Sequence, residues 1–180
     1  MSVVPSSLPQ SSIFEWLTLD QVSREPLRAA IAYWLALRGD RLFPARSDLK
    51  PRDMSSFLPY ISLVAVIDGG ADFENRIAGD IAVRAFSVPL QNRRFSAVAK
   101  DAPALIEMSF KLFRTVVETR APLAFLQQAE HDTHQVALNE AEAILLPLGK
   151  SDTAVDHVAA FAVHSSTIDG WFVPNSLTPP

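Results

Sequence analysis

The order in which hydrophobic periodicity changes along this chain constrains its fold more than any other feature. Two helical patterns and five strand-like runs follow one another as helix 24–38, strands 61–68 and 73–78, helix 101–119, and strands 123–130, 137–149 and 156–164. Strands and long helices do not alternate one for one, as a doubly wound parallel sheet requires. A short link containing Gly69 and Gly70 joins the first two strand-like runs, which is typical of a hairpin. The sequence therefore predicts an α+β domain on an antiparallel sheet.

The two ends of the chain differ in composition from its middle. Residues 1–12 and 174–180 are rich in Pro, Ser, Asn and Thr, which is typical of tails. Residues 13–19 (IFEWLTL) form a short apolar arm whose pattern fits a helix or a strand. We therefore predict an N-terminal tail and arm over 1–23, a single domain over 24–166 and a C-terminal tail over 167–180.

The composition argues against several classes of protein. The chain has 180 residues, a net charge of −4 and a pI near 5.5, whereas a nucleic-acid binder needs a basic face. It contains no cysteine, so disulfides and thiol chemistry are excluded and a reducing cytoplasm is the expected location. The N-terminus lacks the basic and apolar regions of a secretory signal, and no apolar run approaches the ~20 residues that span a bilayer.

The first predicted helix carries two apolar stripes, one of Leu27, Ile31, Trp34 and Leu35 and one of Ala30, Tyr33 and Leu37. Ser23 is its expected N-cap. A helix with one buried face needs only one stripe. The second stripe is therefore either buried within the same domain or covered by a second copy of the chain. We expect a homodimer with Ala30, Tyr33, Leu37 and the arm residue Trp16 at its interface; in the competing account, the arm covers the second stripe within one chain.

A single glycine, Gly79, stands where the second strand-like run ends. A dinucleotide-binding turn needs several glycines, so that backbone N–H groups can approach a pyrophosphate. One glycine followed by Asp80 instead predicts a sharp turn from a strand into a short helix that Asp80 caps.

The most polar cluster, Glu130, His131, Asp132 and His134, falls in a predicted hairpin loop, and no other histidine has metal-like spacing to it. We therefore expect no metal site. Ser165 and Ser166 adjoin His164, but neighbours on a strand point to opposite faces, so they do not form a catalytic triad. His157 and His164 also face opposite sides, and the inward one is either a core histidine or a pocket ligand.

The central sequence resembles a family of bacterial stand-alone PAS-domain proteins that was first catalogued as a domain of unknown function. The matching positions lie in YWLALRGDRLFPARSDLKPRDMSSFLPYISLVAVID, in FENRIAG, in LFRTVVETRAPL and in EAILLPL. They cover most of residues 27–164, and their order and spacing carry the resemblance. It implies a five-stranded antiparallel sheet with flanking helices, here with an N-terminal helical extension. It also implies that Gly79 turns the second strand toward a helix beside a ligand cavity.

On this resemblance, we expect seven residues to line the cavity: Asn75, Ile77, Phe86, Phe110, Phe113, Leu145 and Phe161. The sequence departs from the family where Asn75 replaces a common aromatic residue and where Ala141 and Ala143 replace larger ones. These small side chains would enlarge the cavity or loosen it. Flavin or coumarate photochemistry that depends on cysteine is excluded, since the chain has no cysteine. Haem could bind only through one of the four histidines, and we do not expect it.

We therefore expect a non-catalytic sensory or regulatory module in the cytoplasm. It would bind a small, largely apolar ligand or a protein partner, form a homodimer and pass its signal to another chain. Two alternatives stay open. One is a small α+β enzyme that uses His131, Asp132 and His134, and the other is a scaffold whose cavity is filled by its own side chains. The fold does not name the ligand.

Overall fold

An antiparallel sheet forms the centre of the computed structural model, which describes residues 14–85, 89–128, 140–168 and 171–174. Its strand order is β1-β5-β6-β7-β2-β3-β4, and β8 pairs with the far end of β7. The strands are β1 (Phe14–Leu17), β2 (Ile61–Ile67), β3 (Asp72–Ala78), β4 (Arg93–Arg94), β5 (Leu123–Gln128), β6 (Glu140–Leu148), β7 (His157–Ile168) and β8 (Trp171–Pro174). The predicted α+β class is confirmed.

The described sheet has three strands more than the five that were predicted. The arm forms β1 because Phe14–Leu17 pairs with the outer edge of β5. β4 has only two residues, too few for a periodicity to show. β7 continues to Ile168 and pairs with β8, so strand pairing extends past the domain boundary predicted at residue 166.

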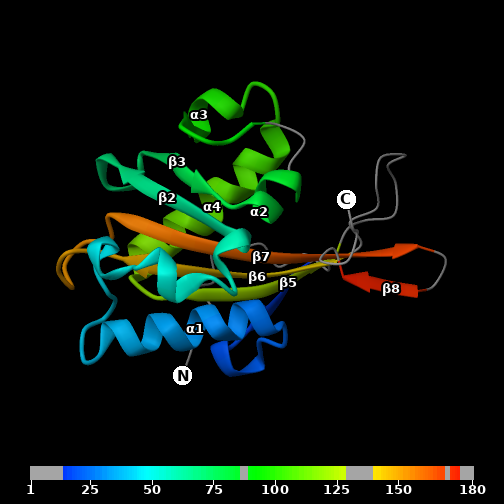
Figure 1. The fold of residues 1–180 in the computed structure, drawn as a ribbon. Coiled ribbons are helices and arrows are strands. Elements are labelled where there is room, and N and C mark those ends of the chain that lie inside the picture. Colours follow the sequence, from blue (N-terminus) through cyan, green and yellow to red (C-terminus); the bar gives the residue numbers. More distant parts are fainter. Residues whose placement is uncertain (1–13, 86–88, 129–139, 169–170, 175–180) are drawn as a thin grey trace.

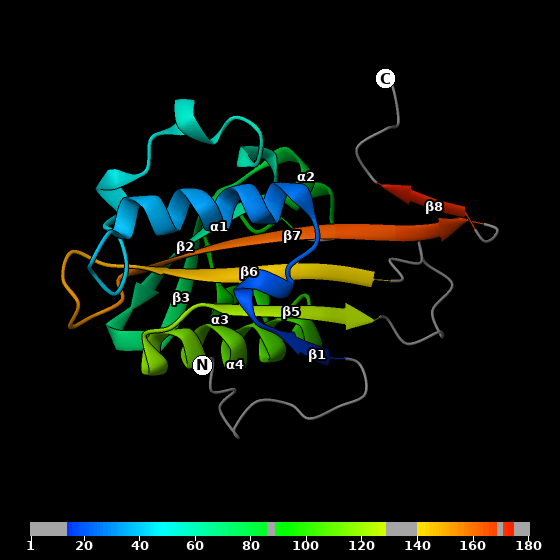
Figure 2. The same cartoon turned by 90° about the horizontal axis from the view of Figure 1, so that it is seen from below.

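Two layers of helices cover the sheet. The helix α1 (Glu25–Arg38) lies across β6 and β7 on one face, and α3 (Phe95–Val98) and α4 (Pro103–Thr119) lie on the opposite face (Figures 1 and 2). The short helix α2 (Asp80–Ala85) follows β3. Single 3-10 turns occupy Leu19–Gln21, Arg46–Asp48, Pro51–Met54, Leu58–Tyr60 and Asp68–Gly70.

Both long helices pack much as their patterns predict, but each begins later than predicted. α1 buries Leu27, Ala30, Ile31 and Trp34 against the sheet, and the Trp34 indole donates a hydrogen bond to the carbonyl of Pro147 (2.9 Å). Its N-cap is Arg24 rather than Ser23. α4 begins after Ala102, two residues later than the predicted start at residue 101, and the Asp101 carboxylate pairs with Arg93 (2.7 Å).

Gly79 turns β3 into α2, as the sequence predicts, but Asp80 is the first residue of α2 and not its N-cap. Its N–H donates to the carbonyl of Ile61 (2.8 Å), and its own carbonyl accepts from Val83 (2.9 Å). A Cβ at this position would lie 2.4 Å from the carbonyl oxygen of Pro59. Glycine is required here because another backbone passes so close, and not because of a positive φ, which Gly79 does not have.

Candidate functional site

A cavity of about 390 Å³ lies between the sheet and α4. Its floor consists of side chains that alternate along β6 and β7, where Ala143 pairs with Ala162 and Leu145 with Ala160. Its roof is the face of α4 that carries Leu105, Ile106, Met108, Ser109, Leu112 and Phe113. Because alanine reaches only one carbon above the sheet, the floor leaves space that larger residues would fill.

The alanines on β6 and β7 explain why a cavity exists here. Ala141, Ala143, Ala160 and Ala162 all line it. The sequence left two outcomes open for Ala141 and Ala143, an enlarged cavity or a loosened one. The structure has an open cavity above them, whose lining is mostly apolar. The scaffold alternative predicts a cavity filled by the protein's own side chains, whereas the structure has open space there.

Asn75 lines the cavity at its inner end. Its side chain is only 2 % exposed, and its Oδ1 atom has no hydrogen-bond partner among the residues that the structure describes. Its backbone carbonyl is already used, because it accepts the N–H of Asn92 (2.6 Å). A buried carboxamide oxygen without a donor costs about 1–3 kcal/mol. Such an atom beside a cavity is a natural point for a ligand to bind.

His164 lies at the other end of the cavity. It pairs with Ala141, which in turn pairs with the exposed Gln127, so these three residues form one polar row across β7, β6 and β5. Burial lowers the pKa of the His164 imidazole below its ordinary value, so the ring is neutral at neutral pH. Its Nε2 atom is buried and finds no partner within the described part of the chain.

The sheet register places these two polar ends far apart. Val64 of β2 pairs with both Asn75 of β3 and Val158 of β7, and His164 lies six residues beyond Val158. At the usual strand rise and spacing, Asn75 and His164 are separated by roughly 20 Å. The cavity is therefore elongated, with Asn75 and His164 far apart in it. The rest of its lining is mostly apolar but includes the hydroxyl groups of Tyr60, Ser62 and Ser109.

The predicted cavity residues divide into those that line it and those that do not. Asn75, Phe113 and Leu145 line the cavity. Phe161 borders the cavity, but its ring packs against Phe57 (5.8 Å between centroids) on the side of α1. Phe110 is half-buried in an aromatic cluster with Phe73 and Phe95. Phe86 lies outside the described residues.

Ile77 was expected beside Asn75 in the cavity, and this is wrong. Leu63 pairs with Ile77 but Val64 pairs with Asn75, so Arg76 is the extra residue of a β-bulge. The bulge breaks the alternation of side chains, and Ile77 is 42 % exposed. Nothing in the pattern Phe-Glu-Asn-Arg-Ile-Ala marks the bulge, because the residues alternate as in a regular strand.

The structure covers the second stripe of α1 within the chain. Tyr33 packs its ring on Phe57 (5.7 Å), and its hydroxyl accepts the N–H of Lys50 (2.9 Å). Ala30 is buried against the sheet, and Leu35, which was assigned to the first stripe, is 42 % exposed. Leu37 is half-buried. The segment after α1, and not the arm, therefore covers this stripe.

Trp16 lies away from α1. It belongs to β1 and packs against Phe14 (5.9 Å) and Phe125 (5.7 Å), which both line the cavity. The observation that motivated the homodimer thus has an explanation within one chain, and the homodimer itself stays a prediction.

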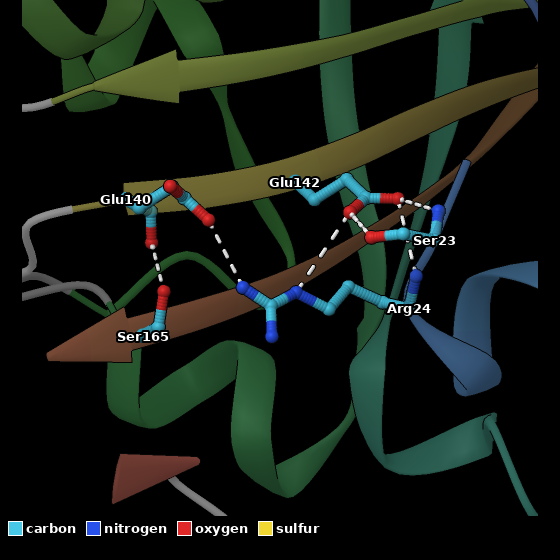
Figure 3. Close-up of polar contacts among 5 residues, drawn as sticks. All are labelled: Ser23, Arg24, Glu140, Glu142 and Ser165. Atoms are coloured by element: carbon cyan, nitrogen blue, oxygen red, sulfur yellow. Dashed lines mark hydrogen bonds and ion pairs between the residues drawn. The ribbon is translucent and has the colours of Figure 1, made fainter. Parts of the chain in front are cut away.

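The face of β6 opposite the cavity carries a polar cluster that sequence reasoning missed. The buried carboxylate of Glu142 accepts hydrogen bonds from the backbone N–H (2.6 Å) and hydroxyl (2.6 Å) of Ser23, and from the backbone N–H of Arg24 (3.3 Å). The Arg24 guanidinium pairs with Glu140 (2.9 Å) (Figure 3). Glu142 thereby binds the start of α1 in the way that an N-cap side chain does.

The alternation Glu-Ala-Glu-Ala over residues 140–143 was the available signal for this cluster. It predicts two carboxylates on the face that alanine does not occupy. Their partners come from residues more than a hundred positions earlier, which no local pattern indicates.

The remaining polar candidates are a predicted loop cluster and His157. Glu130, His131, Asp132 and His134 lie outside the described residues. His157 bonds Asp156 (2.7 Å) at the opposite end of β7 from His164. Within the described ranges, no group of three or more His, Cys, Asp or Glu residues could hold a metal ion. No helix there is long and apolar enough to cross a membrane.

Comparison with known proteins identifies the family. A family model described as PAS domain matches residues 22–161. The chain belongs to this PAS-domain family. The match begins just before α1, so the N-terminal helix lies within the matched segment. A search of curated proteins finds no match, and neither does a search of solved structures. The five strands predicted from the sequence are β2, β3, β5, β6 and β7, and the described sheet adds β1, β4 and β8 to them.

Proposed function

We propose that this PAS domain is a non-catalytic sensory or regulatory module that binds a small, largely apolar ligand in the cavity under α4. PAS domains are in general sensory modules that bind ligands or partner proteins rather than enzymes. The observation that carries the proposal is the elongated cavity above four alanines, since its volume falls in the range of small-molecule sites. Its apolar lining favours an apolar ligand body through the hydrophobic effect.

The connection of the cavity to α1 supports a regulatory role. Ala141 and Ala143 line the cavity, and Glu142 between them binds the start of α1 on the other face. A ligand that displaces β6 would therefore act on the contacts that hold the first turn of α1. The output then passes to a partner chain, either a second copy or another signalling protein.

Mass spectrometry tests the ligand proposal. The purified protein is measured under native and denaturing conditions, and a difference between the two masses reports a retained small molecule. An Ala143→Leu/Ala162→Leu variant, which fills the cavity, is the matched control and should retain nothing. If the wild type keeps no molecule and binds no added apolar probe, the ligand-binding function is wrong.

A further inference from the structure

The unpartnered oxygen of Asn75 restricts the chemistry of any molecule that fills the cavity. Oδ1 is a hydrogen-bond acceptor at the inner end, where the side chain is 2 % exposed and water has little access. A ligand that ended there in a methyl group would leave this acceptor without a donor. A ligand that ended in a hydroxyl or an N–H would supply one. The cost of an unpartnered buried polar group therefore favours the second kind.

No described residue supplies the donor, so in this proposal it arrives through the cavity. Asn75 lies in the sheet between β2 and β4, and its backbone takes part in both ladders. Val64, Leu90, Phe95 and Phe113 line the cavity with Asn75 and are apolar. The hydroxyl groups of Tyr60, Ser62 and Ser109 also line it, but none of them is bonded to Asn75 Oδ1. The four apolar side chains cannot donate a hydrogen bond.

The outer end of the cavity has a different character. Gln127 is exposed, and His164 and Ala141 stand in the same row. A polar group there is close to water and to neutral hydrogen-bonding side chains. At the inner end a charge would be costly, because no Asp, Glu, Lys or Arg is found among the described lining residues. A charged or strongly polar group is therefore tolerated only at the outer end.

We propose that the cavity takes an elongated apolar molecule with polar groups at both ends, whose inner end is an uncharged hydroxyl or N–H that donates to Asn75 Oδ1. The other polar end lies at the row of Gln127 and His164. This inference rests on the proposed ligand-binding function and adds the chemical class of the ligand. The roughly 20 Å between the two ends sets its length.

A matched pair of probes isolates the inner end. Dodecanoate and 12-hydroxydodecanoate share a chain and a carboxylate and differ only in the terminal hydroxyl. Because the carboxylate stays near water, the opposite end of either probe reaches Asn75. Isothermal titration calorimetry of the wild type should give an affinity about tenfold higher for 12-hydroxydodecanoate, which corresponds to one hydrogen bond to an otherwise unpartnered acceptor.

Two variants locate the effect. Asn75→Leu keeps the volume and removes the acceptor, so it should reverse the preference and bind dodecanoate more tightly. Ala143→Leu narrows the cavity floor away from Asn75, so it should weaken both probes by a similar factor. If Asn75→Leu does not fold, NMR of the wild type replaces it: the Asn75 side-chain amide resonances should shift with 12-hydroxydodecanoate and much less with dodecanoate.

The outcomes separate the two proposals. Equal affinity for both probes, a preference for dodecanoate, or a preference for the hydroxyl that survives in Asn75→Leu would overturn the inference while the cavity remains a ligand site. If the wild type binds neither probe and retains no molecule in native mass spectrometry, the ligand-binding function fails and the inference fails with it.

Discussion

At the scale of single residues, buried polar groups distinguish this chain from a generic α+β core. Asn75 and Glu142 are buried at 2 % and 3 % exposure. Glu142 is hydrogen-bonded to Ser23 and Arg24, whereas Asn75 Oδ1 has no partner in the part of the chain that the structure describes. Glu142 is therefore a structural anchor, whereas Asn75 is the residue that we propose binds a ligand. Sequence alone could place Asn75 on an inward face but could not find a partner for Glu142, because that partner depends on the tertiary fold.

Replacing Glu142 should destabilise the protein strongly. Glu142→Ala leaves the backbone N–H groups of Ser23 and Arg24 without their acceptor, so we expect a loss of about 2–4 kcal/mol in the free energy of unfolding, measured by urea denaturation. Glu140→Ala is the control. It removes a partly exposed ion pair with Arg24 and should cost less than about 1 kcal/mol. Similar losses in both variants would contradict the anchoring role.

The pKa of His164 predicts how stability depends on pH. Burial lowers this pKa in the folded protein below the ordinary value of 6.5. Above pH 6.5 the ring is neutral in both states. As the pH falls below that value, the unfolded chain takes up the proton first, so stability declines until the folded pKa is reached.

Urea denaturation of the wild type and His164→Gln at about pH 7.5 and about pH 5.5 measures this effect. The wild type should lose more stability between the two conditions than the variant does, because glutamine does not titrate. Identical losses would show that His164 is not buried as the neutral ring.

At the scale of elements, the long helices and the five central strands follow from periodicity, and the exceptions have local causes. α4 carries a stripe with Ile106, Phe113 and Val116 that the structure buries. The prediction that Ile77 lines the cavity is wrong because one bulged residue, Arg76, changes which side chains of β3 share a face. β1 could not be assigned because four residues fit either period. The sequence could not decide what covers the stripe of Tyr33, because the cover is an irregular segment with three prolines.

The turn at Gly79 offers an element-scale test. In Gly79→Ala, the added Cβ would lie 2.4–2.5 Å from the backbone carbonyls of Pro59 and Leu58, so a backbone must move. We expect the free energy of unfolding, measured by urea denaturation, to fall by about 1–3 kcal/mol. Gly69→Asn is the control, because nothing lies within 4 Å of a Cβ there and asparagine tolerates its φ of 67°. It should cost less than about 1 kcal/mol. A neutral Gly79→Ala would mean that the turn is looser than described.

At the scale of the whole molecule, the PAS-domain fold could be predicted from the order of motifs, while the shape of its cavity could not. The order helix, two strands, helices and three strands leaves few antiparallel arrangements. The cavity instead depends on which residues face α4 across paired strands. Ala141 and Ala143 are neighbours of Ala160 and Ala162 only through the register of β6 and β7.

Assembly is the remaining property of the whole molecule to be tested. We still predict a homodimer through α1, although Tyr33 is engaged within the chain. Multi-angle light scattering at micromolar concentration measures the molecular mass. Leu35→Glu changes a side chain that is 42 % exposed on α1 and should weaken a dimer without unfolding the monomer. A wild type that is monomeric under these conditions would disprove the prediction, and so would a Leu35→Glu/Leu37→Glu variant that stays folded and dimeric.

The two-sided use of β6 also governs which changes of chain length this protein tolerates. Ala141 and Ala143 face the cavity, and Glu142 between them faces α1. Deletion of one residue at the start of β6 would turn a carboxylate toward the apolar cavity and an alanine toward the N–H groups of Ser23 and Arg24. Deletion of two residues would return alanines to the cavity face and a carboxylate to the α1 face. Over evolutionary time, this strand should therefore accept substitutions more readily than insertions or deletions of an odd number of residues. A circular permutation or a tag inserted within the strand should prevent folding.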